Sequence, residues 1–302
     1  MAMTDRSIGD ASSSAYQPAT GATSERLSDV FYALRRNPIT IVGLSIILII
    51  ALMGIFAPFV APYGPLEKNL LHTSEPPSAE FWLGTDPFGH DIFSRIIYGA
   101  RLDLFIAISA VTLSFIIGSI LGAVSGFAGG LLDETTMRGM DVLQAFPRFI
   151  FAMGIAFALG PGVGTVIVAT SVLNVPGYAR LMRTMIASLK ERQFAMAAKA
   201  TGNSPARVLF RHLLPNSLAP LFVMATLHCG WAILEAAGLS FIGLGVPIPR
   251  AEWGVMINIG LQDFLRGDWW GYTFPGIAIA VTVLGFNLLG DGLEDILDPR
   301  RK

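Results

Sequence analysis

Residues Ile39–Val60 read ITIVGLSIILIIALMGIFAPFV and contain no charged side chain. A helix rises about 1.5 Å per residue, so a run of this length crosses the roughly 30 Å of hydrocarbon in a bilayer. Pro58 and Pro62 close the run. We therefore interpret residues 38–60 as a first transmembrane helix.

The composition of the whole chain agrees with a membrane protein. Hydrophobic residues make up 53% of the 302 positions and charged residues only 14%. In soluble proteins, charged residues make up about a quarter of the chain. The formal net charge is −1 and there is one cysteine. These values give no indication of nucleic-acid binding, of a disulfide framework or of a cysteine metal site. The first residues are polar, so no cleavable signal peptide is expected.

Further apolar segments predict an all-α fold, a polytopic bundle of six transmembrane helices. Pro176-Gly177 is expected to interrupt the fourth span, and Gly290-Asp291-Gly292 is expected to end the sixth. Gly118, Gly122 and Gly126 share one face of the second span, a spacing that lets helices approach closely. The spans after the first are expected at about 104–127, 149–159, 163–179, 217–237 and 274–289.

The expected organisation follows from these spans and from the distribution of charge. Most lysines and arginines fall in segments that share one side of the membrane, which predicts that both termini and the 180–216 loop are cytoplasmic. The expected division is a disordered tail (1–25), an amphipathic surface helix (26–37), the first span (38–60), an outer loop or cap (61–102), a transmembrane domain (103–292) that includes two short helices at 190–215, and a C-terminal tail (293–302). For residues 26–37, a simple helical lead-in to the first span is an equal alternative.

A second outer loop is expected at residues 246–272. It holds Trp253, Trp269 and Trp270. Tryptophan is enriched where a membrane meets water. We expect these three side chains to lie at that interface.

The segment Phe194–Asn216 carries helix-boundary signals. Gly202 is suited to end a helix, Ser204-Pro205 to begin another as N-cap and first helical residue, and Pro215 to stop it. The pattern predicts two short helices at an angle. Val208 and Leu209, flanked by Arg207 and Arg211, would form an apolar knob that fits a groove in a soluble partner. The alternative is a loop bound to acidic lipid headgroups, and the residues alone leave both open.

This segment resembles the EAA loop of permease subunits of ATP-binding-cassette importers of the type I fold. Met196 stands where that pattern has Glu, and His212 where it has Ile. The resemblance implies that the loop couples the subunit to its ATPase. The coupling residues implied are Phe194, Ala197, Ala198, Gly202, Ser204, Pro205, Arg207, Val208, Leu209, Arg211, Leu214 and Pro215.

A second stretch, GTDPFGHDIFSR at Gly84–Arg95 with Arg101 beyond it, resembles the signature of dipeptide, oligopeptide and nickel permeases. His90 replaces the usual Arg. The stretch is expected to be either a structural clasp, which we favour, or part of the surface that receives a substrate-binding protein. The signature residues are Gly84, Thr85, Asp86, Gly89, Asp91, Ser94, Arg95 and Arg101. Stretches near Leu239–Gly245, Glu252–Gly254 and Phe286–Pro299 are similar to the C-terminal half of the same family, most like its C-type member.

The resemblance implies a transporter subunit of the bacterial inner membrane without its own ATPase site. It implies a homologous second permease, two ATP-binding subunits that hold ATP and Mg²⁺, and a periplasmic substrate-binding protein. No cofactor or metal is expected in this chain, and no nucleic acid partner. The substrate stays open among dipeptides, oligopeptides, nickel chelates, glutathione, opines and similar small solutes.

Ionisable residues inside spans are candidates for function because burying a charge in lipid is costly. His228 and Glu235 are seven residues apart and therefore share a face of the fifth span; Asn174 is a weaker candidate. They would line the translocation pathway, with Glu235 meeting a cationic or amine group. The alternative is structural: a neutral, hydrogen-bonded His228 and a helix-capping Glu235.

Two other classes of function agree less well with the sequence. A secondary transporter is expected to show internal repeats, and no convincing repeat is present. A membrane-embedded enzyme needs a catalytic set on facing spans, whereas His228 and Glu235 share one. The chain also has no Gly-x-x-x-x-Gly-Lys-Ser/Thr loop for ATP phosphates.

Overall fold

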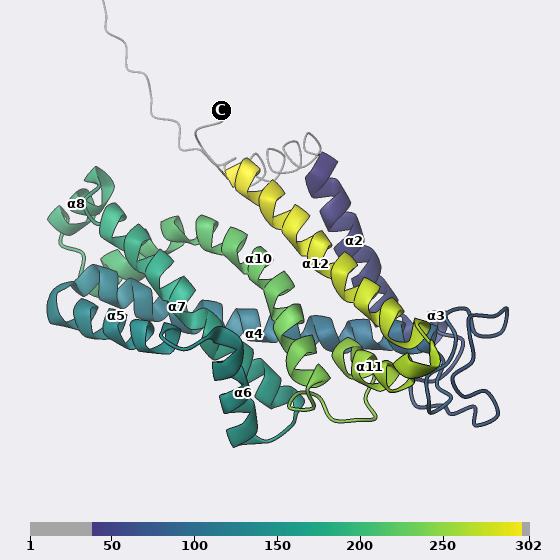
Figure 1. The fold of residues 1–302 in the computed structure, drawn as a ribbon. Coiled ribbons are helices and arrows are strands. Elements are labelled where there is room, and N and C mark those ends of the chain that lie inside the picture. The colour runs from purple at the N-terminus through teal and green to yellow at the C-terminus, as the bar shows by residue number, and fades with distance from the viewer. Residues whose placement is uncertain (1–37, 298–302) are drawn as a thin grey trace, which may run out of the picture.

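Helix α4 (Ile92–Ala128) is 37 residues long and runs through the middle of the subunit (Figure 1). The computed structural model describes residues 38–297, so the expected tail (1–25), the amphipathic helix (26–37) and the last residues of the C-terminal tail lie outside them. Helix α4 begins at Ile92, about three turns before the expected start near Leu104. The cause is local: the Asp91 carboxylate accepts a hydrogen bond from the Ser94 amide at 2.8 Å and caps the helix.

The glycine face predicted on this helix is confirmed. Helix α4 packs most extensively on α7 (Val163–Leu189). A Cβ atom at Gly118 would lie 2.6 Å from the Cβ of Tyr178, and one at Gly126 would lie 2.6 Å from the carbonyl oxygen of Arg183. Only glycine allows the two backbones to approach this closely.

Between α4 and α7 the chain forms a sharply bent pair, α5 (Gly130–Gln144) and α6 (Arg148–Leu159). The two helix axes differ by 89°, and Figure 1 shows α6 turning away from α5. Gly129, with φ of 67°, separates α4 from α5. Asp133 and Glu134 lie inside α5.

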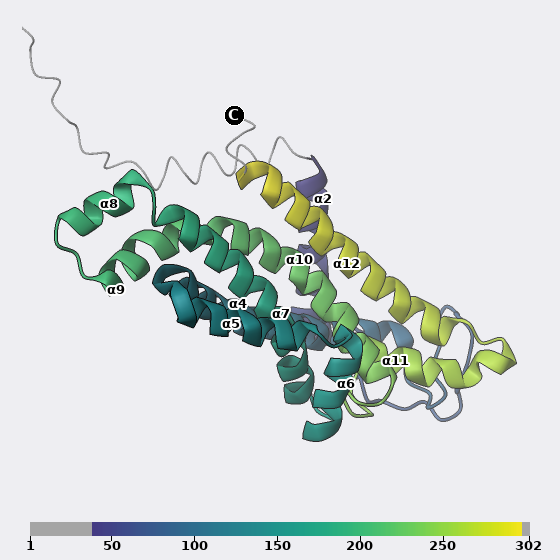
Figure 2. The ribbon, with the colours of Figure 1, turned by 60° about the vertical axis from the view of Figure 1, so that its left-hand side comes forward.

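At the other side of α4, α2 (Pro38–Ile55) and the short α3 (Ala57–Val60) form the expected first span. Helix α2 lies beside α12 (Trp270–Leu297) (Figures 1 and 2). A Cβ atom at Gly43 would lie 2.6 Å from the Leu289 amide nitrogen. The prediction that Gly290-Asp291-Gly292 ends the last span was wrong, because α12 continues through these residues.

Two prolines also fail to break helices as expected. Helix α7 runs through Pro176, and the helix that carries Pro215 continues from α9 (Pro205–Arg207) through η1 (Val208–Leu213) into α10 (Leu214–Phe241). In η1 the amide of Leu214 bonds to the Leu209 carbonyl, the wider spacing of a π-helix turn. This wider turn accommodates a residue that lacks an N–H group.

The second outer loop contains its own short helices, α11 (Trp253–Gly260) and η2 (Leu261–Arg266). Trp253 is only 1% exposed and belongs to the core, and Trp270 is also buried; Trp269 is exposed. The expectation that all three tryptophans lie at the membrane interface was therefore wrong for Trp253 and Trp270.

Four helices of the described part are long and apolar enough to cross a membrane, and a fifth span results if α5 and α6 count as one. The four are α2, α4, the continuous helix Pro205–Phe241 and α12. Helix α7, expected as a span, is not among them, and its second half carries Arg180 and Arg183. The fold is the expected all-α membrane bundle, whereas length and composition alone do not reproduce the count of six.

Candidate functional site

The segment predicted to couple to an ATPase forms an elbow. Helix α8 (Gln193–Ala200) ends two residues before Gly202, whose φ is +80°, a value that favours glycine. The Ser204 hydroxyl then accepts a hydrogen bond from the Arg207 amide at 3.4 Å and begins the next helix. Figure 2 shows α8 and α9 at the opposite end of the bundle from the 61–91 loop. The turn at Gly202 and the Ser204 cap agree with the prediction.

The apolar surface of this elbow is not the one predicted. Val208 and Leu209 are 0% and 5% exposed and pack against Ala195 and Ala198 of α8 in the core of the subunit. They cannot form an exposed knob. The outward apolar side chains are instead Phe194 and Met196 on α8, 42% and 52% exposed, and Phe210. Arg207, Arg211, Pro215 and Ala197 are also exposed, Leu214 is partly buried, and Lys199 adds a further cation at the end of α8.

The signature residues at Gly84–Arg95 fold into a buried clasp. The Asp86 carboxylate accepts from the His90 ring at 2.8 Å and from the His90 amide at 2.9 Å, and lies 3.9 Å from the Arg95 guanidinium. Arg95 itself is 1% exposed and donates to the carbonyl oxygens of Pro65 and Arg250. The clasp thereby joins the first outer loop, α4 and the second outer loop.

Other contacts extend this clasp. Thr85 accepts a bond from the Trp270 indole at 3.2 Å through its carbonyl oxygen, and Ser74 donates to Asp263 of η2. Gly84 and Gly89 have φ of +80° and +76°, which a side chain would strain. Asp91 and Ser94 are buried at the start of α4, whereas Arg101 is exposed. With its central polar groups buried, the clasp offers few of them to a binding protein.

A buried carboxyl pair lies directly beneath the clasp. Asp103 of α4 and Glu252, the residue before α11, are 2% and 0% exposed. Asp103 accepts from the Trp253 amide at 3.2 Å, and Glu252 caps α11 by accepting from the Val255 amide at 2.7 Å. Burial raises the pKa of the Glu252 carboxyl. The pair ties α11 to α4.

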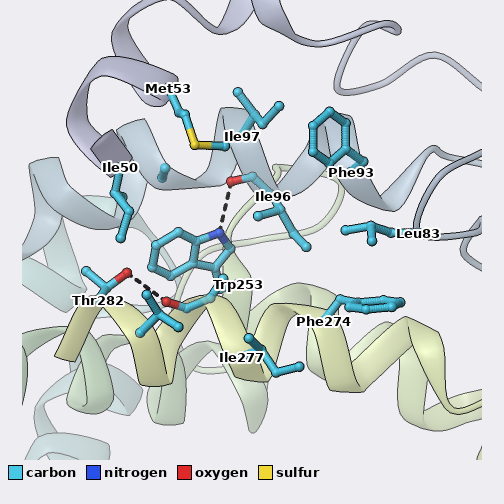
Figure 3. Close-up of a pocket in the computed structure, with 13 residues that line it drawn as sticks. Ile50, Met53, Leu83, Phe93, Ile96, Ile97, Trp253, Phe274, Ile277 and Thr282 are labelled. Atoms are coloured by element: carbon cyan, nitrogen blue, oxygen red, sulfur yellow. Dashed lines mark hydrogen bonds between the residues drawn. The ribbon is translucent and has the colours of Figure 1, made fainter. Parts of the chain in front are cut away.

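An apolar pocket of about 250 Å³ lies between α2, α4 and α12. Figure 3 shows Trp253 in it, with its indole N–H donating to the Ile96 carbonyl at 3.1 Å. Besides this indole, Thr282 is its one polar lining side chain, and its hydroxyl donates to the Ala278 carbonyl of its own helix. The pocket therefore has no group that would recognise a polar solute.

A polar cluster lies instead where α6, α7 and α10 meet. The guanidinium of Arg148 donates to Glu235 Oε1 from Nη2 at 2.5 Å and from Nε at 3.2 Å, and to Asn174 Oδ1 at 3.0 Å. Arg148, Asn174, His228 and Trp231 line a pocket of about 140 Å³. The structure brings Asn174, His228 and Glu235 together, as their assignment to one pathway requires.

The sequence prediction missed Arg148. A signal was available: Arg148 is the only charged residue between Asp141 and Arg180, and Glu235 is the only one between Arg211 and Arg250. Two isolated opposite charges in apolar surroundings are expected to pair, because an unpaired buried charge is costly. Among residues 38–297, no group of three or more His, Cys, Asp or Glu side chains could hold a metal ion.

Comparison with known proteins adds sequence relatives to this geometry. Residues 114–302 match the family model of binding-protein-dependent transport system inner membrane components. Residues 26–77 match the N-terminal transmembrane domain of oligopeptide transport permease C.

Individual relatives match nearly the whole chain. A dipeptide transport system permease protein of Alkalihalophilus pseudofirmus is 46% identical over 91% of this chain and 90% of its own length. An oligopeptide transport system permease protein of Bacillus subtilis is 40% identical over 90% and 89%. A probable D,D-dipeptide transport system permease protein of Escherichia coli is 40% identical over 89% and 90%.

Proposed function

Because the chain belongs to the family of binding-protein-dependent transport inner membrane components, and is a permease subunit of an ATP-binding-cassette importer, we propose that it forms half of a pathway for peptides. The relatives with peptide-transport names support this substrate class. The proposed partners are a homologous second permease, two ATPase subunits that bind ATP and Mg²⁺, and a periplasmic binding protein. Helices α8 and α9 would face the cytoplasm together with both termini.

The elbow of α8 and α9 is the observation that carries the coupling role. It stands at one end of the bundle (Figure 2) and exposes Phe194 and Met196 beside the cations Lys199, Arg207 and Arg211. A short apolar ridge with flanking charges is suited to a groove in a soluble protein. Its rigid turn and its continuity with α10 would transmit movement of the ATPase into the membrane.

The contacts of the clasp support different roles for the two ends of the subunit. These buried polar contacts fix the two loops to α4, so this end of the subunit would move as one body. A binding protein that docks there would meet a rigid surface. Opening and closing of the pathway would then arise from movement between the two permease subunits.

The test is reconstitution of the four-component importer in liposomes with its binding protein. We expect the tagged subunit to retain both ATPase subunits through purification, and ATP to drive uptake of radiolabelled dialanine or trialanine. Loss of the ATPases on purification would contradict the coupling role. ATP-driven uptake of a nickel chelate or a sugar, with no uptake of either peptide, would contradict the peptide assignment.

A further inference from the structure

The accessible member of the Arg148–Glu235 pair is the cation. The Arg148 side chain is 51% exposed and that of Glu235 is 9% exposed. Glu235 Oε1 already accepts two N–H groups from Arg148, and its Oε2 is buried without a partner. In the described residues Arg148 Nη1 makes no hydrogen bond, so an incoming solute would meet the guanidinium first. This is opposite to the expectation that Glu235 meets an amine.

The surface around Arg148 is unsuited to lipid. Arg148 begins α6 at the bend between α5 and α6, and Trp231 of α10, on the same pocket, is 58% exposed. A half-exposed guanidinium flanked by apolar helices is costly in hydrocarbon, so such groups face water or protein. The first N–H groups of α6 have no side-chain cap and add positive potential at the same point.

The pocket has the size and the groups for one end of a solute. Its volume of about 140 Å³ is below the several hundred Å³ that hold a whole small molecule. Besides Arg148 it contains Asn174, held by the Arg148 guanidinium and by the Thr170 carbonyl at 2.9 Å. The His228 ring stands edge-on to Tyr178 with centroids 5.0 Å apart, and its Nδ1 is buried without a partner. An acidic group could engage Arg148 beside this ring.

We propose that Arg148, with Asn174, His228 and Trp231, is a subsite in the translocation pathway that receives a carboxylate of the transported solute. Nε and Nη2 stay on Glu235 and Asn174, and the two N–H groups left on Nη1 can bind an oxygen of the incoming carboxylate. Glu235 keeps the arginine oriented and reduces its net attraction, so that the solute is released. This inference rests on the proposed importer function and names the chemical group that the pathway recognises.

The test uses the assembled importer in liposomes, with Cys229 replaced by alanine so that this chain keeps no native cysteine. Trp231→Cys places a thiol at the pocket, and its rate of modification is measured with an anionic sulfonatoethyl and a cationic trimethylammonium-ethyl methanethiosulfonate. Each rate is divided by that of the same reagent with free mercaptoethanol. Phe222→Cys is the matched control, because it is also exposed but lies nine residues away, about 180° around α10.

We expect the anionic reagent to be favoured by the thiol introduced at position 231, with a normalised ratio that falls about tenfold when Arg148→Gln is added. Glu235→Gln is expected to keep or raise the ratio, because it removes the carboxylate that competes for Arg148. Dialanine is expected to slow modification, and dialanine amide, which lacks the carboxylate, is not. The control thiol at position 222 is expected to show no preference between the reagents.

Several results would overturn the subsite. The first is a preference for the cationic reagent at position 231. The second is a ratio of anionic to cationic modification that Arg148→Gln leaves unchanged or that Glu235→Gln abolishes. The third is that dialanine and its amide protect the thiol from modification equally, or that neither protects it. Reaction in the isolated subunit but not in the assembled importer would overturn it too, by showing that the partner permease covers the pocket. Each of these can occur while the ATPases co-purify and uptake proceeds, so failure of the subsite is distinguishable from failure of the proposed function.

Discussion

Gly122 of α4 lies against the backbone of Ala179 of α7, so closely that a side chain at position 122 has no room. This contact belongs to the most extensive helix pair in the described part of the subunit. The α4–α7 interface is a contact of backbones more than of side chains, and it depends on the small residues that the sequence places there.

The first prediction concerns this interface. Gly122→Ala is expected to destabilise the subunit by about 1–3 kcal/mol, because the added methyl group forces the helices apart. The measurement is the melting temperature of the purified importer. Gly154→Ala in α6, where an added Cβ meets nothing, is the control and is expected to leave the melting temperature unchanged or slightly higher. Equal melting temperatures for the two variants would contradict the packing argument.

The second prediction concerns Trp253, which lies under the clasp. Trp253→Phe keeps an aromatic ring but removes the N–H group that bonds to the Ile96 carbonyl. A loss of about 1–2 kcal/mol is expected from the missing bond and the smaller ring. Trp269→Phe, at an exposed position, is expected to change stability by less than about 0.5 kcal/mol. Thermal unfolding of both variants checks the difference, and a larger effect at Trp269 would refute it.

The third prediction is a pH dependence at Glu252. Burial raises the pKa of this carboxyl above its ordinary value of 4.5, so the folded protein binds a proton there more tightly than the unfolded chain. The associated stability is fully present below the unfolded pKa and is lost as pH rises through the folded pKa.

Glu252→Gln is therefore expected to flatten the decline in melting temperature as the pH rises above about 4.5. The substituted amide keeps an oxygen that can cap α11. Glu80→Gln, at an exposed carboxylate of the first outer loop, serves as the control and should leave the slope as it is. Parallel curves for all three proteins would show that Glu252 does not contribute to the decline.

The fourth prediction distinguishes the exposed and the buried apolar residues of the elbow. The double change Phe194→Ser and Met196→Ser is expected to lower ATPase retention on purification at least tenfold, because hot-spot side chains contribute about 2 kcal/mol or more each. The melting temperature of the isolated subunit should stay the same. Val208→Ser is expected to do the opposite, lowering the melting temperature because Val208 lies in the core. The reverse pattern would place Val208 at the interface.

The sequence was most informative where a local rule acts on a single segment. The apolar run at Ile39–Val60, the turn at Gly202 and the Ser204 cap each follow from a few adjacent residues. The glycine face of α4 also follows from spacing alone. In each case the physical cause lies within one or two turns of helix.

The predictions that failed are those in which tertiary contacts decide. Pro176 is buried and does not end its helix, because water cannot replace a helix's backbone hydrogen bonds inside a membrane protein. Pro215 does not end its helix either, because the wider π turn before it accommodates a residue without an N–H group. Val208 and Leu209 were predicted to be exposed because arginines flank them in the sequence, but in the structure they are buried against α8. The role of Arg148 cannot be predicted from its own segment, because its partner Glu235 is 87 positions away in the sequence.

Helix α4 is long enough to connect the two ends of the subunit mechanically. Its 37 residues extend about 55 Å, well beyond the roughly 30 Å of hydrocarbon. Its first turn is held by the Asp91 cap, and near its last turn Ser125 bonds at 2.5 Å to Asp133, which also holds Arg183. A single long helix thus joins the clasp to the neighbourhood of the elbow. A tilt of this helix would therefore move the clasp and the neighbourhood of the elbow together.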